Sequence, residues 1–270
     1  MVPTKSKAPS NPVEARQKKI KLRGFNNLTK SLSFNIWDIS YAPSAQSRKE
    51  YVEYIDEKYN SDRLSTILEE VVRIIGAHIL NASTQDYDPV GASATLLISE
   101  EPVRPKLTAF HLDKSHVTAH TYPETDDRSA VCTFRVDIDV STCGKISPLN
   151  ALDYLIGSFD SDVVSLDYKV RGFTRDMAGT KHFIDHEIYS ILDFVSDSVT
   201  KRYKYYESNN YQDNLFHSKL MLKDFDLDAY LFKKEVNMLE KQRKKVATLI
   251  EKEMDDIFYS SNHVRRKTYE

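Results

Sequence analysis

The sequence Thr-Phe-Arg-Val-Asp-Ile-Asp-Val, residues 133–140, has the clearest structural pattern in the chain. Phe134, Val136, Ile138 and Val140 alternate with charged or polar residues. Because neighbouring side chains of a strand point to opposite faces of its sheet, this alternation predicts a strand with one apolar and one charged face. A sheet with one solvated face is typically antiparallel.

The segments on either side predict a mixed α+β domain. Residues 31–39 again have alternating apolar side chains, at Leu32, Phe34 and Ile36, which indicates another strand. Residues 61–75 carry an apolar stripe at helical spacing, and Ser61 offers an N-cap. The other predicted elements are a helix over 48–59, strands over 77–82, 93–99, 116–122 and 163–170, and a helix that starts at Ser147 and Pro148. This order has too few helices between strands for a doubly wound parallel sheet, so we expect an antiparallel sheet with helices on one face.

The chain divides into three predicted regions. Residues 1–21 form a basic leader, rich in proline and polar residues, which we expect to be disordered. Residues 22–175 form the α/β core. Residues 176–270 shift toward helix formers and aromatics, so we expect them to form a helical C-terminal extension.

The predicted extension contains two candidate helices, over 182–195 and 233–258. The first would place His182 and His186 on one helix face, where imidazoles can bind a metal. We interpret this pair mainly as helix surface and assign no metal ligand.

Composition excludes several classes of protein. The 270 residues carry 38 Lys and Arg against 40 Asp and Glu, and 40% are hydrophobic, as in a globular chain. The two cysteines, Cys132 and Cys143, are too few for a disulfide scaffold or a four-thiolate metal site. No segment longer than the 12 residues 74–85 lacks a charge, so we expect no membrane span and a cytoplasmic protein. No aromatic residue lies among the basic residues of the leader and the remaining chain is acidic, so we expect no nucleic-acid partner.

Residues that could perform chemistry concentrate in two short segments, since the common nucleotide-binding and hydrolase motifs are absent. The segments are His-Leu-Asp-Lys-Ser-His-Val-Thr-Ala-His-Thr-Tyr-Pro-Glu at 111–124 and Ser-Thr-Cys-Gly at 141–144. Taken singly, Ser115 would be a turn serine, His120 a structural strand residue and Cys143 a small turn residue. Ser115 and His120 have opposite strand parity, so they reach one site only if Ser115 lies in the turn before the strand.

These and other segments make the chain similar to the pyruvoyl-dependent S-adenosylmethionine decarboxylases of the longer bacterial type. The resemblance runs from about Leu22 to about Tyr259. Its motifs are Arg-Gly-Phe-Asn-Asn-Leu-Thr-Lys-Ser-Leu-Ser-Phe at 23–34, Gly-Ala-Ser at 91–93, Leu-Asp-Lys-Ser-His at 112–116, His-Thr-Tyr-Pro-Glu at 120–124, Val-Ser-Thr-Cys-Gly at 140–144 and Arg-Gly-Phe-Thr-Arg-Asp at 171–176. The resemblance implies an α/β sandwich in which two sheets meet, usually within an oligomer.

The resemblance also implies a proenzyme that is cut between Lys114 and Ser115. Ser115 Oγ would attack the carbonyl of Lys114, and His120, as processing base, would assist the elimination that leaves a pyruvoyl group at residue 115. This ketone would form a Schiff base with the substrate amine and accept the electrons released with carbon dioxide. Cys143 is the implied proton donor, because a thiol with a pKa of about 8.5 is mostly protonated at neutral pH.

By the same resemblance, the substrate is S-adenosylmethionine and the product is the aminopropyl donor of spermidine synthesis. Glu124 would hold the ribose hydroxyls, Tyr87 and Tyr122 would contact the nucleoside, and Ser93 would support processing. The resemblance further implies a homo-oligomer of cleaved protomers and a divalent cation such as Mg²⁺, for which we assign no ligands. Two alternatives stay open: the same chemistry on ornithine or arginine, and a non-catalytic paralogue that activates a partner.

Overall fold

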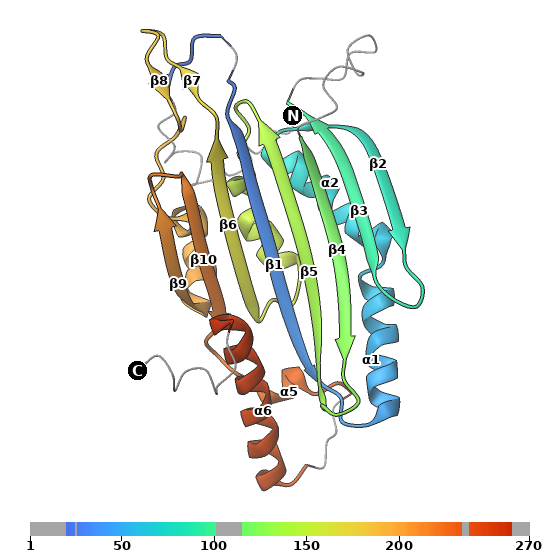
Figure 1. Cartoon of the computed structure of the whole chain (residues 1–270). Coiled ribbons are helices and arrows are strands. Elements are labelled where there is room, and N and C mark those ends of the chain that lie inside the picture. Colours follow the sequence, from blue (N-terminus) through green and yellow to red (C-terminus); the bar gives the residue numbers. More distant parts are fainter. Residues whose placement is uncertain (1–19, 25, 101–114, 234–237, 261–270) are drawn as a thin grey trace, which may run out of the picture.

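A single eight-stranded antiparallel sheet forms the body of the computed structural model, which describes residues 20–24, 26–100, 115–233 and 238–260 (Figure 1). Its strand order is β2-β3-β4-β5-β1-β6-β10-β9. The strands are β1 (Thr29–Tyr41), β2 (His78–Asp86), β3 (Ala92–Ser99), β4 (His116–Thr125), β5 (Val131–Cys143), β6 (Val163–Arg171), β9 (Tyr203–Asn210) and β10 (Leu215–Leu222). The predicted α+β class and the predicted element order up to β6 are confirmed.

The sheet is polarised in the way that the strand patterns predict. In β5 and its neighbour β1, Ile138 lies opposite Phe34 and Val136 lies opposite Ile36, and all four side chains are buried. Their intervening neighbours lie on the other face of the sheet, which is more open to solvent. We call this second surface the open face.

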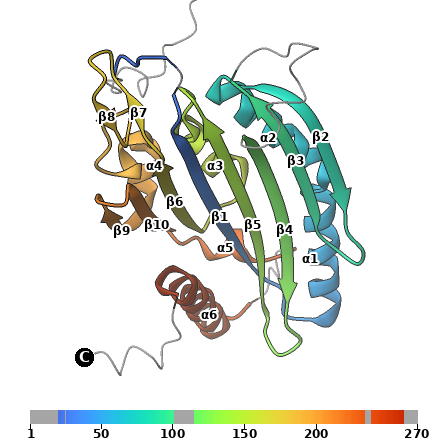
Figure 2. The ribbon, with the colours of Figure 1, turned by 45° about the horizontal axis from the view of Figure 1, so that its top comes forward.

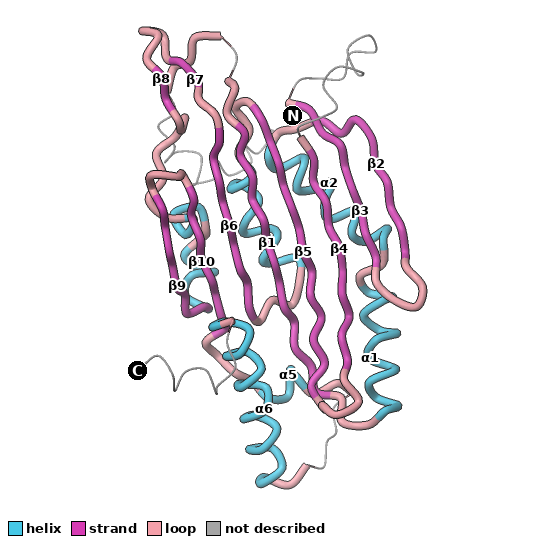
Figure 3. Tube along the Cα trace, viewed as in Figure 1, coloured by secondary structure: helices cyan, strands magenta, loops and turns pink. Residues whose placement is uncertain are grey.

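Helices cover the opposite, apolar face. They are α1 (Ala45–Lys58), α2 (Ser61–Ile75) and α3 (Leu152–Ser158), and Figure 3 shows them in one layer behind the strands. The apolar stripe of α2 is buried against the sheet, as its spacing predicts. The predicted N-cap is wrong by one residue: Asn60 accepts the bond from Arg63 N at 2.9 Å, because Ser61 Oγ bonds to Asp86 instead.

Strand β2 continues to Asp86, beyond the predicted strand end at residue 82. The additional residues pair with β3, so that Asp86 lies opposite Ala92. This pairing extends the edge of the sheet into a segment whose polar composition suggested a turn.

Residues 176–260 are not the helical extension that we predicted. β10 pairs with β6 and β9 pairs with β10, which widens the main sheet, and buried side chains such as Phe216 and Leu220 join the main core. The predicted helix over 182–195 is also wrong. The elements found between β6 and α5 outside the main sheet are β7 (Thr174–Arg175), β8 (Lys181–His182), the 3₁₀ helix η3 (Ile191–Phe194) and α4 (Asp197–Arg202). Tertiary bonds of Asp185 and His186 override the local helix propensity here.

The predicted C-terminal helix is present as α6 (Glu240–Tyr259), preceded by α5 (Leu227–Tyr230). α6 crosses the open face at one end of the sheet, on the side away from α1 and α2 (Figure 2). It buries Val246, Ile250, Met254 and Phe258 in a second apolar cluster with Ile39 of β1. One end of the open face is therefore covered, and the other end carries the polar side chains described next.

Within the described residues, no helix combines the length and the apolar character that a membrane span needs. Of the predicted leader, residues 1–21, the structure describes only positions 20 and 21. Lys114, at the predicted cleavage bond, also lies outside the described residues.

Candidate active site

Ser115 and Cys143 meet at the end of the sheet that α6 leaves open. Ser115 immediately precedes β4, Cys143 ends β5, and the antiparallel register places His116 opposite Ser141. Ser115 Oγ lies 3.2 Å from Cys143 Sγ and accepts a hydrogen bond from Cys143 N at 3.3 Å. Ser115 lies just before the strand, where the predicted start of the strand at residue 116 places it, and only 6% of its surface is exposed.

His120 lies on the open face, five residues further along β4. It stands opposite Ser93 of β3 and Asp137 of β5. Ser93 Oγ lies 2.9 Å from the hydroxyl of Tyr87, so the predicted processing serine, histidine and one nucleoside-contacting tyrosine form a second group.

The two groups are separate within one chain. Five residues of strand correspond to about 16 Å, so His120 does not contact Ser115. Tyr122 and Glu124 lie still further along β4, and both are exposed. The structure thus unites Ser115 with Cys143 and His120 with Ser93 and Tyr87, and leaves Glu124 apart from both groups.

Arg135 and Asp137 of β5 form a charged pair next to the second group. Arg135 Nε lies 3.3 Å from Asp137 Oδ1, and the Arg135 guanidinium stacks 4.3 Å from the ring centre of Tyr122. Burial raises the pKa of Asp137, while the charge of Arg135 partly offsets the rise. The Arg135 guanidinium therefore covers one face of the Tyr122 ring.

Sequence reasoning missed several polar residues around the turn that follows Cys143. Lys30 Nζ and Asn26 Nδ2 both donate to Gly144 O, and Glu100 Oε2 accepts from Lys145 N at 3.1 Å. A signal for Lys30 was present, because it shares strand parity with the buried apolar residues of β1. A lysine on an apolar strand face indicates a buried ionic partner.

The pair His182 and His186 does not lie on a helix face. His182 Nε2 lies 2.8 Å from Asp176 Oδ2, whereas His186 is buried between Asp185 and Tyr168. No group of three or more metal-binding side chains occurs in the part of the chain that the structure describes.

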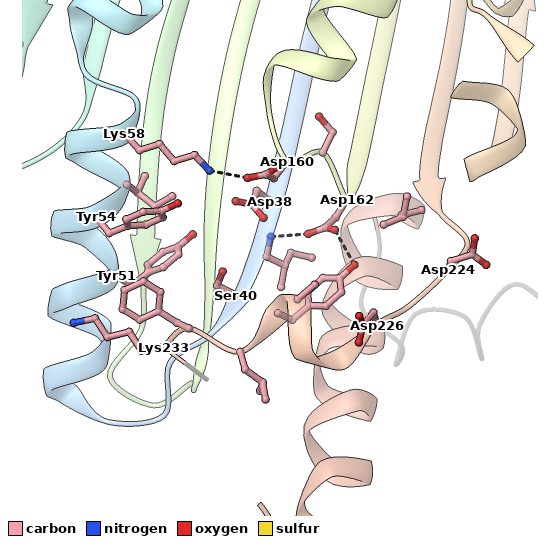
Figure 4. Close-up of a pocket in the computed structure, with 18 of the residues that line it drawn as sticks. Asp38, Ser40, Tyr51, Tyr54, Lys58, Asp160, Asp162, Asp224, Asp226 and Lys233 are labelled. Atoms are coloured by element: carbon pink, nitrogen blue, oxygen red, sulfur yellow. Dashed lines mark hydrogen bonds and ion pairs between the residues drawn. The ribbon is translucent and has the colours of Figure 1, made fainter. Parts of the chain in front are cut away.

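A separate cavity of about 530 Å³ lies at the opposite end of β1 (Figure 4). Its wall includes Asp38, the ion pair of Lys58 with Asp160 at 2.7 Å, and Asp162. None of the predicted site residues lines it.

Comparison with known proteins identifies the family. A family model described as S-adenosylmethionine decarboxylase matches residues 52–172. The S-adenosylmethionine decarboxylase proenzyme of Stenotrophomonas maltophilia (strain K279a) is 54% identical over 255 residues, which cover 90% of this chain and 97% of that protein. The chain belongs to the S-adenosylmethionine decarboxylase family. Family members from Xanthomonas euvesicatoria pv. vesicatoria (strain 85-10) and Xylella fastidiosa (strain M12), also named proenzymes, match with the same identity and coverage.

Two solved structures of S-adenosylmethionine decarboxylases are more distant. The crystal structure from Aquifex aeolicus VF5 is 16% identical with a TM-score of 0.32, covering 61% of this chain and 99% of that one. The Trypanosoma brucei monomer is 14% identical with a TM-score of 0.33, covering 72% and 66%.

Proposed function

We propose that this chain cuts itself before Ser115 and then decarboxylates S-adenosylmethionine with the pyruvoyl group that forms there. The observation that carries the proposal is the 3.2 Å contact between Ser115 Oγ and Cys143 Sγ. It places the residue that would be converted beside the only thiol on the open face of the described residues. The 54% identity to a proenzyme over most of its length supports the same function.

The surroundings of Ser115 suit self-cleavage. Its carbonyl accepts a hydrogen bond from Ile98 N at 3.1 Å, and its hydroxyl accepts one from Cys143 N. These bonds would hold the hydroxyl while it attacks the preceding carbonyl, that of Lys114. His120 would serve as the base for the elimination, as imidazole is well suited to proton transfer near neutral pH.

The pyruvoyl group fits this position. It would supply a carbonyl that condenses with the substrate amine and takes up the electrons released as carbon dioxide leaves. Cys143 would hold the proton that the substrate carbon then receives, because its Sγ lies 3.2 Å from Ser115 Oγ, where the group would form. Both cleavage and turnover would therefore depend on the same contact.

The separation of about 16 Å between Ser115 and His120 leads us to infer a composite site in a dimer. A two-fold axis that packs two open faces together would move His120 and Ser93 of the partner subunit toward Ser115 and Cys143. The polar character of this part of the face supports an active-site interface between subunits rather than a purely apolar contact.

Co-expression of two inactive variants tests the composite site. A Ser115→Ala chain retains His120, and a His120→Ala chain retains Ser115, so a mixed dimer would contain one complete site. We expect each variant alone to stay whole and the His120→Ala chain to be cut in the mixture. Failure of the mixture to restore cleavage, with both chains shown to associate, would refute the composite site.

Intact-mass measurement tests the proposed function as a whole. The purified wild-type chain should separate into fragments 1–114 and 115–270, and the second should carry a carbonyl that reacts with a hydrazine probe. Ser115→Ala should remain one chain. An uncut wild-type chain, or a second fragment that starts with an ordinary serine, would contradict the proposal.

Substrate choice is tested by carbon dioxide release from S-adenosylmethionine, ornithine and arginine. The partly exposed aromatic side chain of Tyr87 and the carboxylate of Glu124 favour a cationic nucleoside over a small basic amino acid. Activation by Mg²⁺ stays a prediction, and activity measured after chelation and again after Mg²⁺ is restored would test it.

A further inference from the structure

A lysine and an aspartate form a buried ion pair beside the candidate active site. Lys30 Nζ lies 2.8 Å from Asp185 Oδ2, and the exposed fractions of the two side chains are 1% and 5%. Burying two charges is costly unless further hydrogen bonds compensate them. The other hydrogen bonds of Lys30 and Asp185 therefore indicate which part of the chain this ion pair holds in place.

The remaining donors converge on the turn that follows Cys143. Lys30 Nζ donates to Gly144 O at 3.0 Å and to Ile146 O at 3.3 Å. Asn26 Nδ2 donates to Gly144 O at 2.9 Å and to Asp185 Oδ2 at 2.7 Å. The side chains of Asn26 and Lys30 thus both donate a hydrogen bond to the carbonyl of Gly144, the residue next to Cys143.

Asp185 is itself oriented by residues behind it. Its Oδ1 lies 2.8 Å from His186 Nδ1, and His186 Nε2 lies 3.3 Å from the hydroxyl of Tyr168. Burial by itself would raise the pKa of Asp185, but the His186 bond and the Lys30 charge hold it well below its usual range. Asp185 therefore stays ionised, and the network keeps its charge pair at neutral pH.

The turn is held from its other side as well. Glu100 Oε2 accepts from Lys145 N, and the Glu100 carboxylate occupies the space in which a β-carbon on Gly144 would lie. The positive φ of Gly144, +77°, also requires glycine. The backbone after Cys143 is consequently fixed on two sides.

We propose that Asn26 and Lys30, oriented by Asp185, are positioning residues that hold the thiol and the N–H of Cys143 against residue 115. This inference rests on the proposed function, because it assigns a role to residues that act through Cys143. It assigns a role to Asn26 and Lys30 of the motif 23–34 and to Asp185, for which the sequence analysis gave none. Lys30 and Asn26 belong to fragment 1–114, and the Gly144 carbonyl to which they donate belongs to fragment 115–270. The network would therefore also join the two products of cleavage.

Two variants disturb the network without leaving a buried charge unpaired. Asn26→Leu removes one donor to Gly144 and keeps the Lys30 and Asp185 pair. The double variant Lys30→Met with Asp185→Asn removes both charges together. Tyr230→Phe is a matched control, because it removes a buried hydrogen bond of 2.8 Å to Asp162 at the opposite end of the sheet.

Self-cleavage is the first readout, since it precedes any substrate turnover. We expect Asn26→Leu to slow cleavage about tenfold and the double variant about a hundredfold, as small displacements of reacting groups cost this much. Tyr230→Phe should cleave at the wild-type rate. Circular dichroism confirms that each variant is folded before rates are compared.

The second readout is the alkylation rate of Cys143 by N-ethylmaleimide in uncleaved Ser115→Ala chains. We expect the network variants to raise this rate about tenfold, because the turn opens more often. Cys132, which is fully buried, is the internal reference and should stay slow in every chain.

The two readouts separate the possible failures. A wild-type chain that is not cut refutes the proposed function, while the alkylation measurement still tests the positioning role. Folded network variants that match Tyr230→Phe in Cys143 alkylation overturn the positioning role, whatever the cleavage result. If the double variant does not fold, Asn26→Leu alone decides between these outcomes.

Discussion

The buried carboxyl group of Asp162 should make the fold less stable as the pH rises from about 5 to about 7. Asp162 accepts hydrogen bonds from Ile39 N and from the Tyr230 hydroxyl, each at 2.8 Å, at the edge of the cavity in Figure 4. Burial raises its pKa from 3.8 to about 6, although these two bonds oppose the rise. The folded chain therefore binds the proton more tightly than the unfolded chain does.

The sign and size of the effect follow from this difference. A raised carboxyl pKa adds stability that is fully present below the unfolded value and is lost as the pH rises through the folded value. For pKa values of 3.8 and about 6, the free energy of unfolding should fall by about 1.3 kcal/mol between about pH 5 and about pH 7. Asp185 does not contribute in this window, because its folded pKa is lowered and its stabilising effect is lost only in stronger acid.

Urea unfolding of the uncleaved Ser115→Ala chain, followed by circular dichroism, measures this difference. Other groups also contribute to the pH dependence, among them Asp38, whose pKa is raised by burial, so the comparison is with Asp162→Asn in the same background. Asparagine can still accept from Ile39 N but cannot ionise. The slope against pH should be smaller for the variant, and equal slopes in the two chains would refute the assigned role of Asp162.

Three further substitutions should have separable effects. Gly144→Ala, whose β-carbon would displace the Glu100 carboxylate from Lys145 N, should slow self-cleavage about tenfold on a gel time course, whereas Gly179→Ala, with open space and a similar φ, should not; equal rates would contradict the role of this contact. Ile250→Ala should lower the free energy of urea unfolding by about 2–5 kcal/mol, against about 1 kcal/mol or less for its exposed neighbour Leu249→Ala. Cys143→Ser should reduce carbon dioxide release by the cleaved enzyme about a hundredfold or more, since a hydroxyl is a much weaker acid than a thiol; unchanged release would exclude Cys143 as proton donor.

Local patterns predicted the parts of the fold in which one strand or helix face is buried. The alternation in β5 and β1 and the stripe of α2 each correspond to an element with the expected buried face. The same reasoning failed for residues 182–195 and for β9 and β10. There, the pairing of β10 with β6 and the bond of Asp185 to Lys30 help to determine the conformation, and both involve partners that are distant in sequence.

The hydrogen-bond network around Gly144 could not be predicted from local sequence patterns, for a related reason. Lys30 and Asp185 are separated by 155 positions, and neither residue alone specifies its partner. Parity placed Lys30 on the apolar face of β1, which indicates that a counter-ion exists but not where it comes from. The segment that supplies Asp185 was predicted to be a helix, and a helix there would have removed the pair.

Strand geometry predicts the positions of Ser115 and His120 along β4, but it does not bring them into one site within a single chain. The predicted strand bounds placed Ser115 just before β4 and His120 within it, as the structure shows, but the rise per residue separates them by about 16 Å, so the shared site that the parity argument allowed is not formed within one chain. Along this stretch β4 pairs with β3 and β5 without a register shift, so no bulge shortens the gap. If both residues act on the same peptide bond, they must therefore come from different copies of the chain, so the proposed chemistry and the proposed assembly depend on each other.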